Sequence, residues 1–135
     1  MTTILEFETV AVLVWLTLEA EPAHLVGTGG AIGAICRHLV YQRLAWEAFP
    51  LATLTVNTVG SFVFALVAFG DAGASAFYLI GIGACGAFTT FSSFSVETVQ
   101  LWERGQRRRA AFNAGINLVS ALVGIAFAWL LVNGF

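Results

Sequence analysis

Long apolar stretches alternate with short polar segments along most of the sequence. Four of them, at residues 23–45, 51–70, 76–101 and 110–133, reach the roughly 20 apolar residues that an α-helix needs to cross a bilayer. The strand periodicity of a membrane β-barrel is absent from the sequence. The pattern therefore predicts an all-α membrane protein, with a single four-span membrane domain over residues 22–135.

The first 21 residues do not fit this pattern. Their apolar part, Val10 to Leu18, is too short to span a bilayer, and acidic residues flank it. We expect residues 1–21 to form an N-terminal extension, for which an interfacial helix is one option. Pro22 then suits the first turn of the first span.

The third stretch contains a segment that is unusual for a membrane helix, GIGACGAFTTFSSFSVE at residues 81–97. Its glycines Gly81, Gly83 and Gly86 each weaken a helix by about 1 kcal/mol relative to alanine. The hydroxyl side chains that follow can bond backbone groups released by an interrupted helix. Non-helical backbone at membrane depth is tolerated only where protein buries it or where it lines a watery cavity. The segment therefore predicts a break in the third helix that builds a site.

Polar residues recur on one face of the second and fourth stretches. Thr53, Asn57 and Ser61 are spaced four apart, and the Asn57 amide is able to donate hydrogen bonds either to another helix or to an anion. The stripe in the fourth stretch consists of Asn113, Asn117, Ser120 and Gly124. Exposure of such a stripe to lipid would be costly, so we expect it to face protein or water.

The first stretch combines small residues with a charge. Gly29 and Gly33 have the spacing that lets two membrane helices approach closely. Arg37 follows one turn later. A charge inside a span is usually paired or functional, although a long arginine side chain can also reach the interface. The sequence is compatible with both interpretations of Arg37.

The distribution of basic residues predicts an orientation. All six are arginines, and with four spans they fall in or beside the first and third loops: Arg37, Arg43, Arg104, Arg107, Arg108 and Arg109. Loops rich in arginine remain on the cytoplasmic side of a membrane. We therefore expect a multi-pass protein of the plasma membrane with these two loops in the cytoplasm and both termini outside.

Two phenylalanines near the predicted break suggest a path for an anion. Phe91 and Phe94 lie on one helix face, among hydroxyls rather than leucines. Because the edge of an aromatic ring is positive, two ring edges can guide a small anion without holding it tightly. Carbonyl oxygens released between Gly86 and Thr89 suit a hard cation, and two facing breaks in a dimer would supply enough of them for one buried sodium ion.

Taken together, these motifs resemble the Fluc (CrcB) fluoride channel family. The resemblance rests on GGAIGAICR at 29–37, ATLTVNTVGSF at 52–62 and GACGAFTTFSSFSVE at 83–97, which follow the order and spacing of the family. The TTFSSF motif is specific, whereas GGxxGAxxR alone would be weak. The resemblance covers residues 23–133 and leaves out the N-terminal extension.

The resemblance implies an antiparallel dimer of four-helix subunits, with two fluoride pores and a structural sodium ion at the dimer interface. Carried over by motif, the pore residues would be Phe91, Phe94, Asn57, Thr53 and, by a looser alignment, Ser120. Sodium would be bound by the backbone carbonyls of Gly86 and Thr89. Structural roles would fall to Arg37, Gly29 and Gly33.

The chain departs from the family at one position of the expected pore. A tyrosine is common in the first half of span four, and none is found here; Asn113 and Asn117 are the candidate donors in its place. The family also occurs either as one chain inserted both ways or as two related chains of opposite orientation. Because the arginines lie on one side only, we expect a fixed topology and pairing with an oppositely oriented paralogue.

The sequence thus predicts a passive fluoride-selective channel that lowers cytoplasmic fluoride. It predicts no enzyme, because no nucleophile, base or cofactor motif is apparent. The expected partners are fluoride, membrane lipid and a second chain, and no nucleic acid. A small four-span multidrug exporter is the first alternative, but it needs a membrane carboxylate, and Glu97 is the only acid within a span. The second alternative is a membrane scaffold in which glycines and hydroxyls serve packing alone.

Overall fold

The structure, a computed structural model, describes residues 22–44 and 49–134, whose regular structure is entirely helical. In chain order the elements are α2 (Pro22–Arg43), α3 (Leu51–Phe69), α4 (Gly73–Ala76), the π-helical η1 (Phe77–Cys85), α5 (Gly86–Phe88), α6 (Phe91–Glu103) and α7 (Arg107–Asn133). The four predicted stretches correspond to α2, α3, the run from α4 to α6, and α7. The interfacial helix considered for residues 1–21 lies outside the described residues.

Among the residues that the structure describes, three segments are long and apolar enough to cross a membrane: α3, the run Gly73–Glu103 and α7. The described part of the chain is therefore all-helical and has several segments suited to span a bilayer, as predicted. α2 is not among the three, although it is 22 residues long. Its polar side chains, such as Arg37 and His38, lower its mean hydropathy below that of the others.

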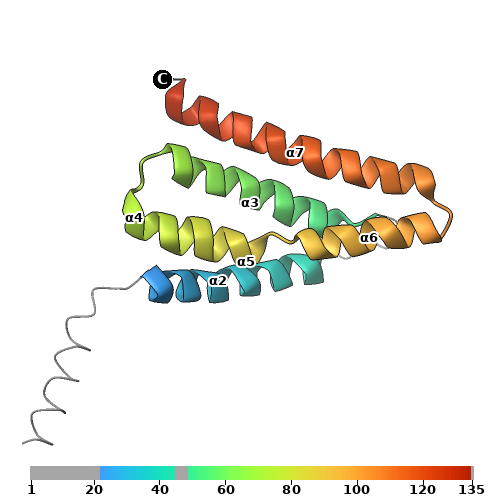
Figure 1. The fold of residues 1–135 in the computed structure, drawn as a ribbon, viewed down its shortest axis with the longest axis horizontal. Coiled ribbons are helices and arrows are strands. Elements are labelled where there is room, and N and C mark those ends of the chain that lie inside the picture. The colour runs from blue at the N-terminus through green and yellow to red at the C-terminus, as the bar shows by residue number, and fades with distance from the viewer. Residues whose placement is uncertain (1–21, 45–48, 135) are drawn as a thin grey trace, which may run out of the picture.

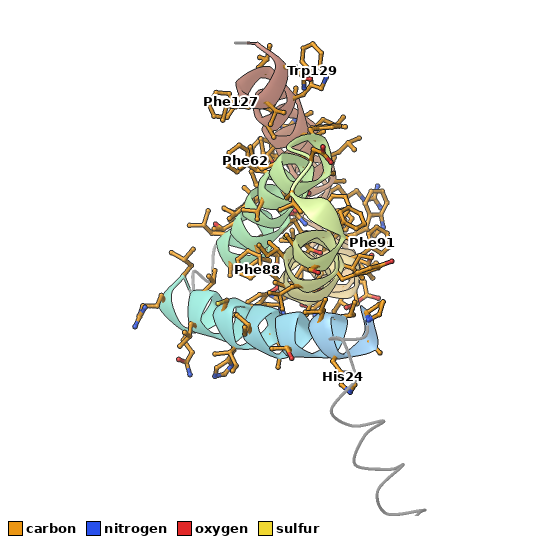
Figure 2. The ribbon with its side chains drawn as sticks, turned by 90° about the vertical axis from the view of Figure 1, so that its left-hand side faces the viewer. His24, Phe62, Phe88, Phe91, Phe127 and Trp129 are labelled. Atoms are coloured by element: carbon orange, nitrogen blue, oxygen red, sulfur yellow. The ribbon has the colours of Figure 1, made fainter. Side chains whose placement is uncertain are left out.

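α2 and α7 lie on opposite sides of the molecule, with α3 and the run from α4 to α6 between them (Figure 1). α2 packs mainly against η1, whereas α7 packs against α3 and α6. Many large apolar side chains stay exposed in the single chain, and Figure 2 shows Phe127 and Trp129 on the outside of α7. Such an apolar exterior suits contact with lipid or with another protein.

Glycines allow α2 and η1 to touch backbone to backbone. A Cβ atom added at Gly29 would overlap the carbonyl oxygen of Leu79, and one added at Gly33 would overlap that of Ala84. From the η1 side, a Cβ at Gly83 would lie 2.7 Å from the carbonyl oxygen of Val26. Glycines from the first and third stretches therefore serve the same close helix contact.

The glycines do not interrupt the third helix, although we predicted that they weaken it. Helical backbone continues through Gly81, Gly83 and Gly86, with a π-helical ladder over Phe77–Cys85. The interruption comes at Thr89 and Thr90, within the predicted segment but three residues after its last glycine. Of the three glycines, Gly83 packs directly against α2 and stays helical there, and the hydroxyl-rich part of the segment contains the break.

The basic loop predicted over 102–109 is shorter than expected. α6 continues to Glu103 and α7 begins at Arg107, so that a tight corner with Gly105 at φ 76° joins them. The Arg107 guanidinium lies over the Trp102 ring, 5.0 Å from its centroid. Arginines in the first turn of a helix oppose the helix dipole, so helix stability does not account for their position.

Candidate functional site

The break in the third membrane segment is formed by two extended threonines. Thr89 has ψ 159° and ends α5, and Thr90 has φ −151° and precedes α6. The Thr90 hydroxyl caps α6 by accepting a hydrogen bond from the Ser93 amide at 3.2 Å. On the other side, the Thr89 amide and hydroxyl both donate to the Cys85 carbonyl at 3.0 Å. Both helix ends at the break are thus closed by these two side chains.

Asn57 of α3 holds the break from the side. Its Oδ1 accepts a hydrogen bond from the Thr90 amide at 2.8 Å, and its Nδ2 donates to the Thr90 carbonyl at 3.2 Å. The side-chain amide therefore replaces the helical partners of the N–H and C=O groups of Thr90, a buried residue. Because the Thr90 amide donates to Asn57, it does not donate to Gly86 O, its partner in a continuous α-helix.

Carbonyl oxygens at this break suit a hard cation. Gly86 O lacks its helical partner, and Thr89 O lies outside regular helix, where Arg37 Nη1 approaches it at 3.5 Å. The surroundings of Gly86 are open, since a Cβ added there would meet nothing within 4 Å. Uncharged main-chain oxygens at an interrupted helix are the ligands that membrane proteins use for sodium. The predicted residues therefore fit the expected ion in chemical type.

Phe91 and Phe94 lie directly after the break and pack against each other. Their ring centroids are 5.6 Å apart, at an interplanar angle of 48°. Phe91 is 79% exposed and projects from the side of the bundle (Figure 2), whereas Phe94 is half-buried. The two rings line a groove of about 310 Å³, which we call the Phe91–Phe94 groove; its polar lining comes from Asn57, Ser61, Thr89, Thr90 and Asn117.

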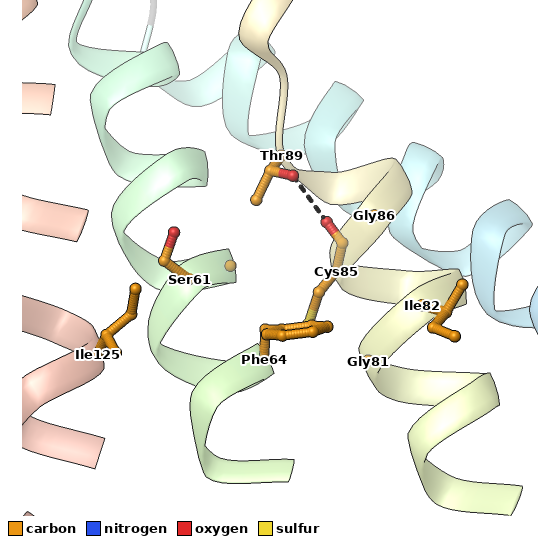
Figure 3. A pocket seen from close by; sticks show the side chains of 9 residues that line it. Ser61, Phe64, Gly81, Ile82, Cys85, Gly86, Thr89 and Ile125 are labelled. Carbon is orange, nitrogen blue, oxygen red and sulfur yellow. Dashed lines mark hydrogen bonds between the residues drawn. The ribbon is translucent and has the colours of Figure 1, made fainter. Parts of the chain in front are cut away.

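A second groove lies on the other side of Thr89. It measures about 410 Å³ and runs between α3 and the η1–α5 segment. Figure 3 shows Phe64 and Ile82 at its wall and the Thr89 hydroxyl directed to the Cys85 carbonyl. Ser61 and Thr89 line both grooves, so the break separates a mixed polar and aromatic groove from a largely apolar one.

The asparagine stripe of α7 faces protein, as expected. Asn113 is completely buried and Asn117 is 6% exposed. Asn117 Oδ1 accepts a hydrogen bond from Asn57 Nδ2 at 3.3 Å, which links the stripe to the break. Of the two candidate replacements for the missing tyrosine, only Asn117 lines the Phe91–Phe94 groove.

Thr53 belongs to a separate polar cluster. It is completely buried, its hydroxyl donates to Glu97 Oε1 at 2.8 Å, and the Tyr41 hydroxyl lies 2.6 Å from it. Because the Thr53 hydrogen points to Glu97, Tyr41 is the donor in the second contact. Glu97 Oε2 is buried without a hydrogen-bond partner among the residues that the structure describes.

The sequence motifs gave a role to Thr53 alone in this cluster, as an expected pore residue. Tyr41 received no predicted role, and Glu97 stood out only as an acid within a span. The available signal was spacing, since Glu97 follows Phe94 by three residues and therefore shares its helix face.

Ser120 also lies away from the two rings. Its hydroxyl accepts from Thr58 Oγ1 at 2.8 Å and donates to the Asn117 carbonyl at 3.3 Å. It lines a groove of about 410 Å³ between α3 and α7, together with Phe62 and Phe127. The structure therefore brings Phe91, Phe94 and Asn57 together and sets Thr53 of α3 and Ser120 of α7 outside the Phe91–Phe94 groove.

Comparison with known proteins adds to this description. A family model described as "CrcB-like protein, Camphor Resistance (CrcB)" matches residues 24–131. The chain is similar to "Fluoride-specific ion channel FluC 2" of Haloarcula marismortui, with 58% identity over 113 residues that cover 84% of this chain and 95% of the relative. For "Fluoride-specific ion channel FluC 1" of Halobacterium salinarum the identity is 49% with the same coverage. "Fluoride-specific ion channel FluC 3" of Methanosarcina acetivorans is 42% identical, over 78% of this chain and 96% of that relative.

Proposed function

Because this chain belongs to the CrcB family, we propose that it is a passive fluoride-selective ion channel that lowers the fluoride concentration in the cytoplasm. The relatives described above carry the name of fluoride-specific ion channels, which supports the channel and not the multidrug exporter. The observation that carries the proposal within this chain is the position of the Phe91 and Phe94 rings beside the break that Asn57 holds.

The path of the anion would follow the Phe91–Phe94 groove. Ring edges offer weak positive potential, and Asn57 Nδ2 offers a hydrogen-bond donor. In the structure that nitrogen donates to Thr90 O at 3.2 Å and to Asn117 Oδ1 at 3.3 Å. The bond to Asn117 is the longer one, and a passing fluoride would replace it while the bond to the break remains.

Selectivity for fluoride follows from the type of these groups. Fluoride is small and a strong hydrogen-bond acceptor, so amide and hydroxyl donors favour it over chloride. None of the polar residues that line the groove carries a formal charge. A path of weak contacts binds the anion well enough to remove water and still releases it, as conduction requires.

A complete pore would need a second chain. We propose an antiparallel dimer with α2 as the fourth span, supported by the exposure of Phe91 and the open surroundings of Gly86. Two facing breaks would hold one sodium ion by the carbonyls of Gly86 and Thr89 from each chain, and the ion would supply fixed positive charge at the dimer centre.

The partner and the orientation follow from the arginines. Two of the six lie in the C-terminal half of α2, and the other four lie at the corner between α6 and α7. With four spans these regions share one side, which we assign to the cytoplasm, and both termini lie outside. So strong a bias favours one fixed orientation, and we therefore propose that the partner is an oppositely oriented paralogue.

Fluoride efflux from liposomes, followed with a fluoride electrode, tests the channel. We expect efflux from the chain reconstituted with its paralogue. Phe94→Ile should lower it about tenfold, because loss of an aromatic contact worth about 1.4 kcal/mol corresponds to that factor. Phe127→Ile is the matched control, since Phe127 lies on α7 away from the two rings.

The other outcomes identify the alternatives. Proton-coupled transport of organic cations without fluoride efflux would indicate a multidrug exporter, and no transport at all would indicate a scaffold. Efflux from this chain alone would contradict the proposed pairing with a paralogue and would still support the proposed channel function.

A further inference from the structure

A buried hydrogen-bond chain reaches Phe94 from α7. Asn113 of α7 is completely buried, and its Nδ2 donates to Thr98 Oγ1 of α6 at 2.8 Å. The Thr98 hydroxyl in turn donates to the main-chain oxygen of Phe94 at 2.7 Å. Asn113 is thus two hydrogen bonds away from the turn of α6 that presents the Phe94 ring.

The same side chain also reaches the break. Asn117 Nδ2 donates to the side-chain oxygen and to the main-chain oxygen of Asn113, both at 3.0 Å. Asn117 Oδ1 accepts from Asn57 Nδ2 at 3.3 Å, and Asn57 holds Thr90. Asn113 is therefore connected to both walls of the Phe91–Phe94 groove, although it does not line the groove itself.

Neighbours that can act in only one way determine the orientation of these amides. The Thr90 amide can only donate, so the atom of Asn57 that faces it is Oδ1. The main-chain oxygen of Asn113 can only accept, so the atom of Asn117 that faces it is Nδ2. All donors consequently point the same way, from Asn57 through Asn117, Asn113 and Thr98 to the carbonyl of Phe94.

We propose that Asn113 is a positioning residue of the pore. It fixes the Phe94 turn through Thr98 and the Asn57 amide through Asn117, and so sets the distance between ring edge and donor that an anion meets. The proposal rests on the proposed channel function. It goes beyond that function because it assigns selectivity to a side chain that the anion does not touch.

The flux test uses Asn113→Leu and Thr98→Val, which remove the hydrogen bonds and keep similar volume. Each should lower the ratio of fluoride to chloride permeation about tenfold, as expected for one buried hydrogen bond. The double variant should lower it no further, because both residues act through one chain of bonds. A merely structural role would reduce the number of folded channels and leave the ratio unchanged.

Two matched controls accompany these variants. Ser95→Ala removes a hydroxyl that donates to the Phe91 carbonyl at 2.9 Å, the same type of bond on the same helix without a partner on α7. Asn133→Leu removes an asparagine of α7 that, within the described part of the chain, bonds only to its own helix, at Trp129 O. Both should keep the wild-type permeability ratio.

Hydrogen exchange of residues 88–96 in nanodiscs tests the coupling without any fluoride. Asn113→Leu should speed exchange of the Thr90 amide at least about fivefold, whereas Asn133→Leu should not. Unchanged exchange, or faster exchange with an unchanged permeability ratio, would overturn the positioning role. If wild-type protein conducted no fluoride, the channel proposal would fail, and the exchange measurement would still decide whether Asn113 controls the break.

Discussion

The two halves of the broken membrane segment are built in different ways. The first half, from Gly73 to Phe88, is rich in glycine and meets α2 through bare backbone at Gly29 and Gly33. The second half, α6, meets α3 and α7 through side chains that exchange hydrogen bonds, such as Thr98 with Asn113. The change from one type of contact to the other coincides with the break at Thr89 and Thr90.

This difference explains why the site lies where it does. Backbone-to-backbone packing leaves no room for a ligand between α2 and η1 and tolerates little change there, because main-chain atoms cannot rotate away. Side-chain contacts leave grooves between them, and hydroxyl and amide groups can change partners. The rigid half therefore anchors the helix end, and the adjustable half presents Phe91 and Phe94.

The largest expected effect is in the rigid half. Gly33→Ala places a methyl group onto the Ala84 carbonyl, which no side-chain rotation can relieve. We expect a loss of about 3 kcal/mol, at the upper end of the cost of overpacking. Gly27→Ala in the same helix meets nothing within 4 Å and should preserve or slightly raise stability, because alanine favours helix.

Buried Cys85 supplies a reporter for this measurement. In a Cys36→Ser background the exposed thiol is removed, and labelling of Cys85 by a thiol-reactive dye follows unfolding in detergent. Equal unfolding temperatures for the alanine variants at Gly27 and Gly33 would contradict the close packing of α2 on η1.

A smaller effect is expected in the adjustable half. Asn57→Leu leaves the buried Thr90 amide and carbonyl without their side-chain partner. Loss of these bonds should cost about 2 kcal/mol, because water in the adjacent groove compensates part of the penalty. The same thiol-labelling assay measures this loss of stability. Fluoride efflux per folded channel should also decrease.

Asn133→Leu serves as the control here as well, since among residues 22–44 and 49–134 Asn133 bonds only within α7. Wild-type stability and efflux in Asn57→Leu would show that the break persists without the amide.

Much of this architecture is visible in the sequence. Hydropathy alone predicted α3 and α7 closely, because a bilayer sets both the length and the composition of a span. The hydroxyl-rich TTFSSF segment predicted an interruption, and the helical spacing of the stripe from Asn113 to Gly124 predicted a face turned toward protein or water. These features are local, so they can be recognised without knowledge of the tertiary contacts.

Other features depend on contacts between distant residues. The glycines of the third stretch appeared to be the cause of the break, but all three are helical and Gly83 packs against α2; only the structure pairs Gly33 with Ala84. The sequence left open whether the Asn57 amide bonds another helix or an anion, and the structure shows it bonded to Thr90 and Asn117. The Tyr41–Thr53–Glu97 cluster joins three helices and has no local signature.

The smallest expected effect lies at the junction of the two halves. Gly86 has ordinary helical angles, φ −61° and ψ −38°, and open space at its Cβ position. Gly86→Ala should therefore leave the unfolding temperature of the isolated chain unchanged or raise stability by less than about 1 kcal/mol. Gly83→Ala, three residues earlier, should lower stability, because its methyl group would lie 2.7 Å from Val26 O.

The same two variants also test the proposed dimer, when stability and association are measured with and without the paralogue. If a second chain packs at the break, Gly86→Ala should weaken association although the single chain tolerates it, because a methyl group would enter the space between facing carbonyls. Gly83→Ala should instead destabilise the single chain whether or not a partner is present. Equal association of wild-type and Gly86→Ala chains would show that the dimer contact lies away from Gly86. That result would also contradict the proposed sodium site at the Gly86 carbonyl.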